Sequence, residues 1–204
     1  MMEQVVRWIN DQEVPFGRAV PLSTMGTRSA LIAETAFRRA AVGASLFPAD
    51  DDAERASAAM ISLLPRGQFG DAVLSPGEQL EVGLIQRNLM RYAEVLGNPE
   101  YFPKIPGCGV VNNSIGDIYS FAHLVEVKTV SRPFRSTDLR QLLTYSAMMR
   151  ASGIAVEKLS LYNPRRAYRF TADLDEISLS LCGRSSVELM EDLIDTMIGF
   201  QVSA

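Results

Sequence analysis

The chain has 204 residues, of which 47% are hydrophobic and 22% are charged, and its formal net charge is -4. This composition is that of a globular chain and excludes a disordered or low-complexity one. Its two cysteines, Cys108 and Cys182, exclude an internal disulfide framework and a four-cysteine metal site. No run approaches the roughly 18–20 apolar residues that span a bilayer, and the first ten residues lack a secretory-signal pattern, so we expect a cytoplasmic protein without a membrane segment.

Helices dominate the structure that we expect for the first hundred residues. The apolar spacing predicts helices from Arg28 to about Val42, from about Ala53 to Leu64, and from about Ser75 to Leu96. Ser75, Pro76 and Glu78 at the start of the third helix resemble an N-cap with a capping-box partner. We therefore predict a helical N-terminal region over residues 1–75 and a core over residues 76–204 that ends in a helix.

The core is expected to mix strands and helices. The strands that we predict are Gly116–Phe121, Leu124–Val130, Lys158–Asn163 and Arg165–Thr171, and the helices are Thr137–Ala151 and Ser185–Phe200. Only Ala122 and His123 separate the first two strands, which favours a hairpin with these residues in its turn. The order helix, strand, strand, helix, strand, with room for one more strand ahead of Asp117, indicates an α/β fold.

The second of these strands carries two charged residues with a strand's spacing. Glu126 and Lys128 are two apart, so their side chains leave the strand on the same face. A hairpin would bring Asp117, on the preceding strand, close to Glu126. Two carboxylates at one strand edge suit Mg²⁺ or Mn²⁺, and Lys128 could orient a water or stabilise charge on phosphorus. The alternative is a surface salt bridge on an edge strand, because an acid and a lysine two residues apart are common.

The helix that follows carries polar residues on one face. Gln141 and Tyr145 are four residues apart, and Asp138 lies three before Gln141 on the same side. A helix packed beside the strand ends would present Gln141 to a phosphate or a metal-bound water. The alternative is that these are ordinary polar residues on the solvent-exposed side of a helix.

The series Gly116-Asp117, Glu126-Val127-Lys128 and Gln141-x-x-x-Tyr145 resembles the motifs of the PD-(D/E)xK nuclease superfamily, and its last element resembles the RecB-like branch. The resemblance covers roughly residues 80–170. It implies a restriction-endonuclease-like core, in which helices flank a mixed β-sheet, and metal-dependent hydrolysis of phosphodiester bonds.

The resemblance also implies a role for each residue. Asp117 and Glu126 would bind Mg²⁺ or Mn²⁺ with the backbone carbonyl of Val127, Lys128 would be the catalytic lysine, and Gln141 and Tyr145 would assist near the substrate. An acidic residue from the helix ahead of the sheet often joins the metal site in this family, and Glu81 is the candidate, with Glu78 second. The family's upstream histidine is missing, and we assign no role to His123.

A basic segment could meet the nucleic acid. Between Ser131 and Phe170, eight arginines and lysines stand against two acids, although the chain as a whole is acidic. The candidate phosphate contacts are Arg132, Arg135, Arg165 and Arg166. A solvated surface of mixed charge is the alternative reading of this segment.

The function that we expect is that of a metal-dependent nuclease that acts on DNA, with RNA as an open alternative. It could act alone, as a homo-oligomer, or with a protein partner in a defence or repair assembly. The residues do not distinguish an endonuclease from an exonuclease. A second hypothesis is a catalytically silent subunit of the same fold that binds nucleic acid or a partner protein. A third is an accidental motif match in a helical interaction protein.

Overall fold

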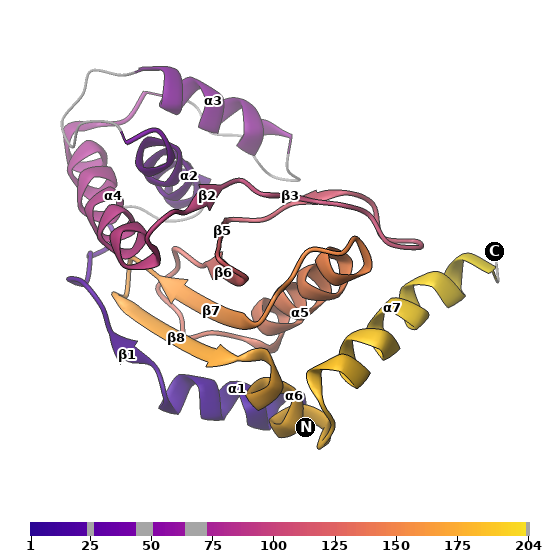
Figure 1. Ribbon diagram of the computed structural model, residues 1–204. Coiled ribbons are helices and arrows are strands. Elements are labelled where there is room, and N and C mark those ends of the chain that lie inside the picture. Colours follow the sequence, from indigo (N-terminus) through magenta and orange to yellow (C-terminus); the bar gives the residue numbers. More distant parts are fainter. Residues whose placement is uncertain (24–26, 44–50, 64–72, 203–204) are drawn as a thin grey trace.

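The structure is a computed structural model that describes residues 1–23, 27–43, 51–63 and 73–202. A mixed sheet of six strands lies between two layers of helices (Figure 1). The helices are α1 (Met2–Asp11), α2 (Thr27–Ala41), α3 (Asp51–Ser62), α4 (Pro76–Leu96), α5 (Ser136–Ala151), α6 (Leu174–Cys182) and α7 (Ser186–Val202). The strands are β1 (Val14–Pro15), β2 (Glu100–Tyr101), β3 (Lys104–Ile105), β4 (Ser114–Ile115), β5 (Ile118–Ser120), β6 (His123–Val127), β7 (Lys158–Asn163) and β8 (Tyr168–Asp173). The α/β class is thus confirmed. Within these ranges, no helix is both long and apolar enough to cross a membrane.

The sheet is ordered β1-β8-β7-β6-β5-β2 and contains one parallel pair. Strands β6 and β7 are parallel and are joined by α5, whereas all other neighbours in this sheet are antiparallel. The carboxyl ends of β6 and β7 therefore meet at the same end of the sheet, where ligands commonly bind in α/β folds. Strands β3 and β4 form a separate two-stranded sheet that reaches past α5 (Figure 1).

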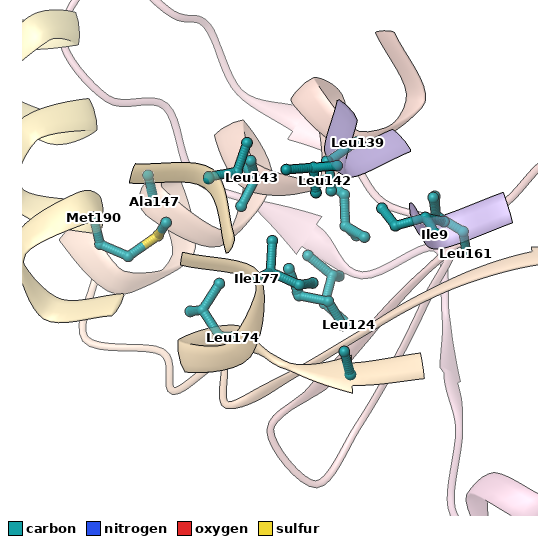
Figure 2. Close-up of a cluster of buried hydrophobic side chains, with 14 of the residues drawn as sticks. Ile9, Leu124, Leu139, Leu142, Leu143, Ala147, Leu161, Leu174, Ile177 and Met190 are labelled. Atoms are coloured by element: carbon teal, nitrogen blue, oxygen red, sulfur yellow. The ribbon is translucent and has the colours of Figure 1, made fainter. Parts of the chain in front are cut away.

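Both faces of the sheet are covered. On one face, Leu124 and Leu161 pack with the apolar sides of α1, α5, α6 and α7, and Figure 2 shows the leucines of α5 directed at this cluster. On the other face, Ile118, Val125 and Tyr162 pack against α2, α3 and α4. Strand β6 is consequently a central strand buried on both sides. It is not the edge strand that a simple surface salt bridge would occupy.

The capping box predicted at the start of α4 is confirmed. The Ser75 hydroxyl accepts a hydrogen bond from the Glu78 backbone N–H, and the Glu78 carboxylate accepts one from the Ser75 N–H. Each bond satisfies a donor that the first turn of a helix leaves unpaired. Farther along α4, the Asn88 amide donates to the carbonyls of Arg18 and Pro164 at 2.8 and 2.7 Å. Asn88 thereby fastens both the segment after β1 and the turn after β7 to α4.

Gly17 leaves the space in which the Asn88 side chain makes these hydrogen bonds. Its φ is +103°, in the region that favours glycine, and a Cβ there would lie 2.5 Å from the Asn88 side-chain oxygen. Any other residue at position 17 would displace the Asn88 side chain or the segment that it holds.

The predicted helices are close to those observed, and Lys158–Asn163 is observed as predicted. The helix predicted from Ala53 to Leu64 is α3, which begins two residues earlier, and Leu64 lies outside the described residues. The last predicted strand was placed too early. Asn163 accepts hydrogen bonds from the backbone N–H groups of Arg165 and Arg166, so these residues form a turn and β8 begins at Tyr168.

The hairpin forms, but its turn lies one residue earlier than predicted. His123 pairs with Ser120 as the first residue of β6, and Phe121 and Ala122 make the turn with positive φ angles of 46° and 61°. Ahead of Asp117, where one further strand was expected, three short strands are observed, β2, β3 and β4, whereas α1, β1 and α6 were not predicted. Helix α1 contacts α5 and α6, and β1 pairs with β8, so this first part of the chain packs with the sheet.

Strand β1 covers only part of the edge of β8. It pairs with Tyr168 and Arg169 alone, and within the described ranges residues 170–173 of β8 have no strand partner on that side. The sheet therefore ends on this side in an edge that is half closed.

Shortening a core side chain tests the two-sided burial of the central strands. We expect Leu161→Ala to lower the free energy of unfolding by about 2–5 kcal/mol, because Leu161 is 1% exposed and its loss leaves a cavity. Leu80→Ala, at an exposed position of α4, is the matched control and should change stability by less than about 0.5 kcal/mol. Chemical denaturation measures both, and equal small effects would contradict the packing described.

Candidate active site

The hairpin places the two acidic residues of the motif opposite each other. Ile118 of β5 pairs with Val125 of β6, and continuing this antiparallel register by one residue sets Asp117 across from Glu126. Lys128 directly follows β6, and its backbone N–H still donates to the Tyr162 carbonyl of β7. The three side chains therefore gather at the carboxyl end of β6.

Each carboxylate is held by one protein donor. The Val127 backbone N–H donates to Asp117 Oδ2 at 2.7 Å, and Lys128 Nζ donates to Glu126 Oε1 at 2.6 Å. Within the described chain, Asp117 Oδ1 and Glu126 Oε2 accept no hydrogen bond from a protein N–H. The donors fix both groups and leave one oxygen of each to another partner.

The neighbouring carboxyl groups, Glu126 buried and Asp117 half-buried, lie where the charged form is disfavoured. Burial raises the pKa of Asp117 to about 6, although the Val127 N–H and the charge of Lys128 oppose the shift. Burial and then the negative charge of Asp117 raise the pKa of Glu126 to about 8. The Glu126 carboxylate more than offsets the burial of Lys128, so the pKa of this amine is raised and it remains charged. Two acids that resist ionising together are the arrangement that a divalent cation relieves.

A chain of hydrogen bonds connects Lys128 to the helix α5 and to β4. Lys128 Nζ donates to Gln141 Oε1 at 3.0 Å, and Gln141 Nε2 donates to the Tyr145 hydroxyl at 3.2 Å. Ser114 Oγ donates to the same hydroxyl at 2.8 Å. The residues at the Gln-x-x-x-Tyr spacing thus position the lysine, and Ser114 joins them, a residue that the sequence pattern did not single out.

Glu81, the candidate for a further metal ligand, is engaged elsewhere. It is 3% exposed and forms an ion pair with Arg165, which is 2% exposed, and it accepts a hydrogen bond from the Ser23 N–H at 2.8 Å. Glu78, the second candidate, caps α4 and pairs with Arg28, which holds its pKa at about 2. Neither carboxylate is brought to Asp117 and Glu126.

Glu34 on α2 is the acid that electrostatics connects to the site. Its negative charge contributes to the raised pKa of Asp117, although its carboxylate also pairs with Arg38 at 2.8 Å. Glu34 could not be predicted from the spacing of residues, because α3 and α4 lie between α2 and the strands along the chain. Its position on the helix face that also carries Leu31 was the available signal.

Most of the arginines proposed as phosphate contacts are neutralised within the protein. Arg132 makes two hydrogen bonds to Asp138 at 2.6 and 3.0 Å, and Arg166 makes two to Glu13 at 3.0 and 2.6 Å. Arg165 is buried with Glu81, whereas Arg135 is exposed and forms no ion pair within the described chain. The positive charge counted along the sequence therefore does not form an uncompensated basic face from these residues.

The described residues contain no group of three or more histidine, cysteine, aspartate or glutamate side chains arranged to hold a metal ion. Asp117 and Glu126 are a pair, and completing a coordination shell would need the Val127 carbonyl, water or substrate oxygens. Mg²⁺ commonly binds through one or two carboxylates together with waters and phosphates, so a pair suits this ion.

The raised pKa of Asp117 has a consequence for stability. A carboxyl whose pKa rises from 3.8 unfolded to about 6 folded stabilises the protein at low pH, and this contribution is lost as the pH rises through 6. Asp117→Asn keeps an oxygen for the Val127 N–H and removes the charge. Without divalent cations, we expect the free energy of unfolding of the variant, relative to that of the wild type, to increase by about 1–3 kcal/mol as the pH rises from 4 to 8. Denaturant unfolding across this range measures the difference, and parallel pH profiles would refute the raised pKa of Asp117.

Comparison with protein-family models, with curated proteins and with solved structures finds no match for this chain. The geometry of Asp117, Glu126 and Lys128 therefore carries the functional argument that follows.

Proposed function

We propose that the protein is a metal-dependent nuclease of the PD-(D/E)xK kind, with a restriction-endonuclease-like core, and that it hydrolyses phosphodiester bonds in DNA. The observation that carries the proposal is the juxtaposition of the buried carboxyl group of Glu126, the half-buried one of Asp117 and the ammonium group of Lys128 at the carboxyl end of a central strand. Gathering three ionisable groups where solvent reaches them only in part is costly unless they compensate one another or bind an ion. A structural ion pair needs only one carboxylate and one amine. The second carboxylate adds a negative charge that a bound cation would compensate.

The residues of the chain divide the work of the proposed reaction. Asp117 and Glu126 would hold Mg²⁺ or Mn²⁺ through the oxygens that no protein N–H occupies, with the Val127 carbonyl beside them. The bound ion would polarise a phosphate oxygen and lower the pKa of a water. Lys128 remains protonated and would direct its positive charge at the negative charge that develops on the phosphate oxygens.

Gln141 and Tyr145 act on the lysine in this proposal. Gln141 Oε1 accepts from Lys128 Nζ, so it restricts the amine to positions between Glu126 and α5. Tyr145 orients the amide of Gln141 and is itself held by Ser114. Fixing the amine in advance reduces the reorganisation that the reaction requires. Glu34 replaces Glu81 as the acid from the upstream helices, since its charge already acts on Asp117.

Removing the lysine tests catalysis. We expect purified protein with Mg²⁺ or Mn²⁺ to cleave plasmid or oligonucleotide DNA, and Lys128→Ala to reduce the rate by about 100-fold or more, because the transition-state charge loses its partner. Lys158→Ala, at the opposite end of the sheet, is the matched control and should cleave at the wild-type rate. A wild type that stays inert on DNA and RNA with both metals would favour the silent binding subunit.

Cation binding tests the site separately from cleavage. Isothermal titration should detect Mn²⁺ binding that weakens steeply as the pH falls from 8 to 5, because protons compete for carboxyl groups with pKa values of about 6 and 8. Asp117→Asn should abolish the uptake, and Glu34→Gln should weaken it. Asp173→Asn, an exposed carboxylate on β8, is the control. Uptake that is indifferent to Asp117 would place the ion elsewhere.

A further inference from the structure

A pocket of about 690 Å³ lies at the end of the sheet opposite the candidate active site. His123 and Lys158, which begin the parallel strands β6 and β7, both line it, so it sits at the amino ends of these strands. His123 precedes Glu126 by three residues, a separation of about 10 Å along a strand. The pocket and the candidate active site are therefore distinct.

Arg169 supplies the pocket with a positive charge that no carboxylate of the described residues neutralises. Its guanidinium lies 4.7 Å from the centre of the Phe16 ring and 6.0 Å from that of Tyr92, and within the described ranges its side chain makes no hydrogen bond or ion pair. Lys158, the other charged base in the lining, is paired with Asp173 at 3.1 Å. Arg169 therefore retains planar N–H donors of the kind that bind carboxylate and phosphate groups.

A row of hydrogen-bonded polar side chains crosses the sheet beside Arg169. His123 Nε2 lies 2.7 Å from Ser160 Oγ, which lies 2.6 Å from Thr171 Oγ1, on three adjacent strands. Burial, together with the charges of Lys158 and Arg169, lowers the pKa of His123 to about 4, so the imidazole is neutral at pH 7. If Nε2 carries the proton, Ser160 accepts from His123 and donates to Thr171, whose exposed side chain lines the pocket.

Phe121 lines the pocket and is 79% exposed. Both turn residues, Phe121 and Ala122, have positive φ, a conformation for which two-residue hairpins usually use Asn-Gly. A bulky residue in this conformation is strained, and such strain gathers at functional sites. The Phe121 ring lies over Gly97, at 3.7 Å from where its Cβ would be, and Trp8 and Phe170 add further aromatic lining. The turn thus presents a flat apolar surface close to the charged floor.

We propose that this pocket binds a small aromatic anion, a molecule with one planar ring system and one phosphate or carboxylate group. Arg169 and Thr171 hold the anionic group, and Phe121 contacts the ring. Glu157 and Glu176 also line the pocket and disfavour a ligand with more than one anionic group. The open edge of β8 offers backbone groups to an extended peptide instead, but a paired strand has no need of an unneutralised guanidinium.

The chain contains a single histidine, which makes the imidazole of His123 a direct reporter by NMR. AMP and indole-3-acetate serve as the phosphate and carboxylate probes, and adenosine and ribose 5-phosphate lack the anion and the ring respectively. The titrations are performed in a chelator and repeated with Asp117→Asn, so binding in the catalytic site cannot contribute. We expect one or both anionic probes to shift the His123 resonances saturably, and adenosine and ribose 5-phosphate to bind at least about tenfold more weakly.

Three variants separate a ligand site from effects on folding. Arg169→Met should weaken binding at least about tenfold. Phe121→Asn suits the turn better and should raise the melting temperature while weakening binding, whereas Ala122→Gly relieves the same turn, keeps the ring and should leave binding unchanged. Equal binding of AMP and adenosine, unaffected His123 resonances, or full binding by Arg169→Met would each overturn the proposal. Binding of an unrelated extended peptide in place of every small probe would assign the pocket to strand addition and overturn it as well.

Discussion

The ionisation of Glu126 is the constraint on which the candidate active site depends. This carboxyl group lies on the central strand β6, under the cover of α5, with Asp117 across the strand pair and Lys128 two residues along. One positive charge cannot compensate two negative ones in an environment that already disfavours charge. The raised pKa values of the two carboxyl groups result from this lack of positive charge, and a divalent cation is the simplest partner that supplies it. The hydrogen bonds through Gln141, Tyr145 and Ser114 matter for the same reason, because they hold the single amine, that of Lys128, in place.

The two layers of helices serve this arrangement in different ways. The layer of α5 supplies Gln141 and Tyr145 directly, whereas the layer of α2 and α4 supplies a negative charge from Glu34 and a rigid backing for Val125. Asn88 joins that second layer to the turn after β7, at the carboxyl end where the candidate site lies. Helices remote in sequence therefore fix the strand ends from both sides. Sites supported in this way hold their geometry better than sites on loops.

Local patterns in the sequence predicted much of the fold and of the site. The periods of 3.6 and 2 located α2, α3, α4, α5, α7, β6 and β7, and the hairpin placed Asp117 near Glu126 because an antiparallel register follows from a short turn. What escaped prediction depends on distant contacts. Whether Glu81 or Glu34 faces Asp117 is decided by the packing of α2 and α4, and the pairing of Arg132, Arg165 and Arg166 with acids is invisible to a count of charges along the chain. The turn was misplaced because Phe121 and Ala122 are unusual residues for it.

The half-closed edge of β8 has a consequence for handling the protein. Strand β1 and helix α1 are the elements that shield this side of the sheet, and both belong to the first fifteen residues. A protein trimmed or cleaved before Phe16 would expose the whole length of β8 together with the apolar surface that α1 now covers. Uncovered strand edges recruit other chains, so self-association through β8 is the hazard that accompanies such a cut. A tag or fusion is better joined after α7, where the sheet plays no part.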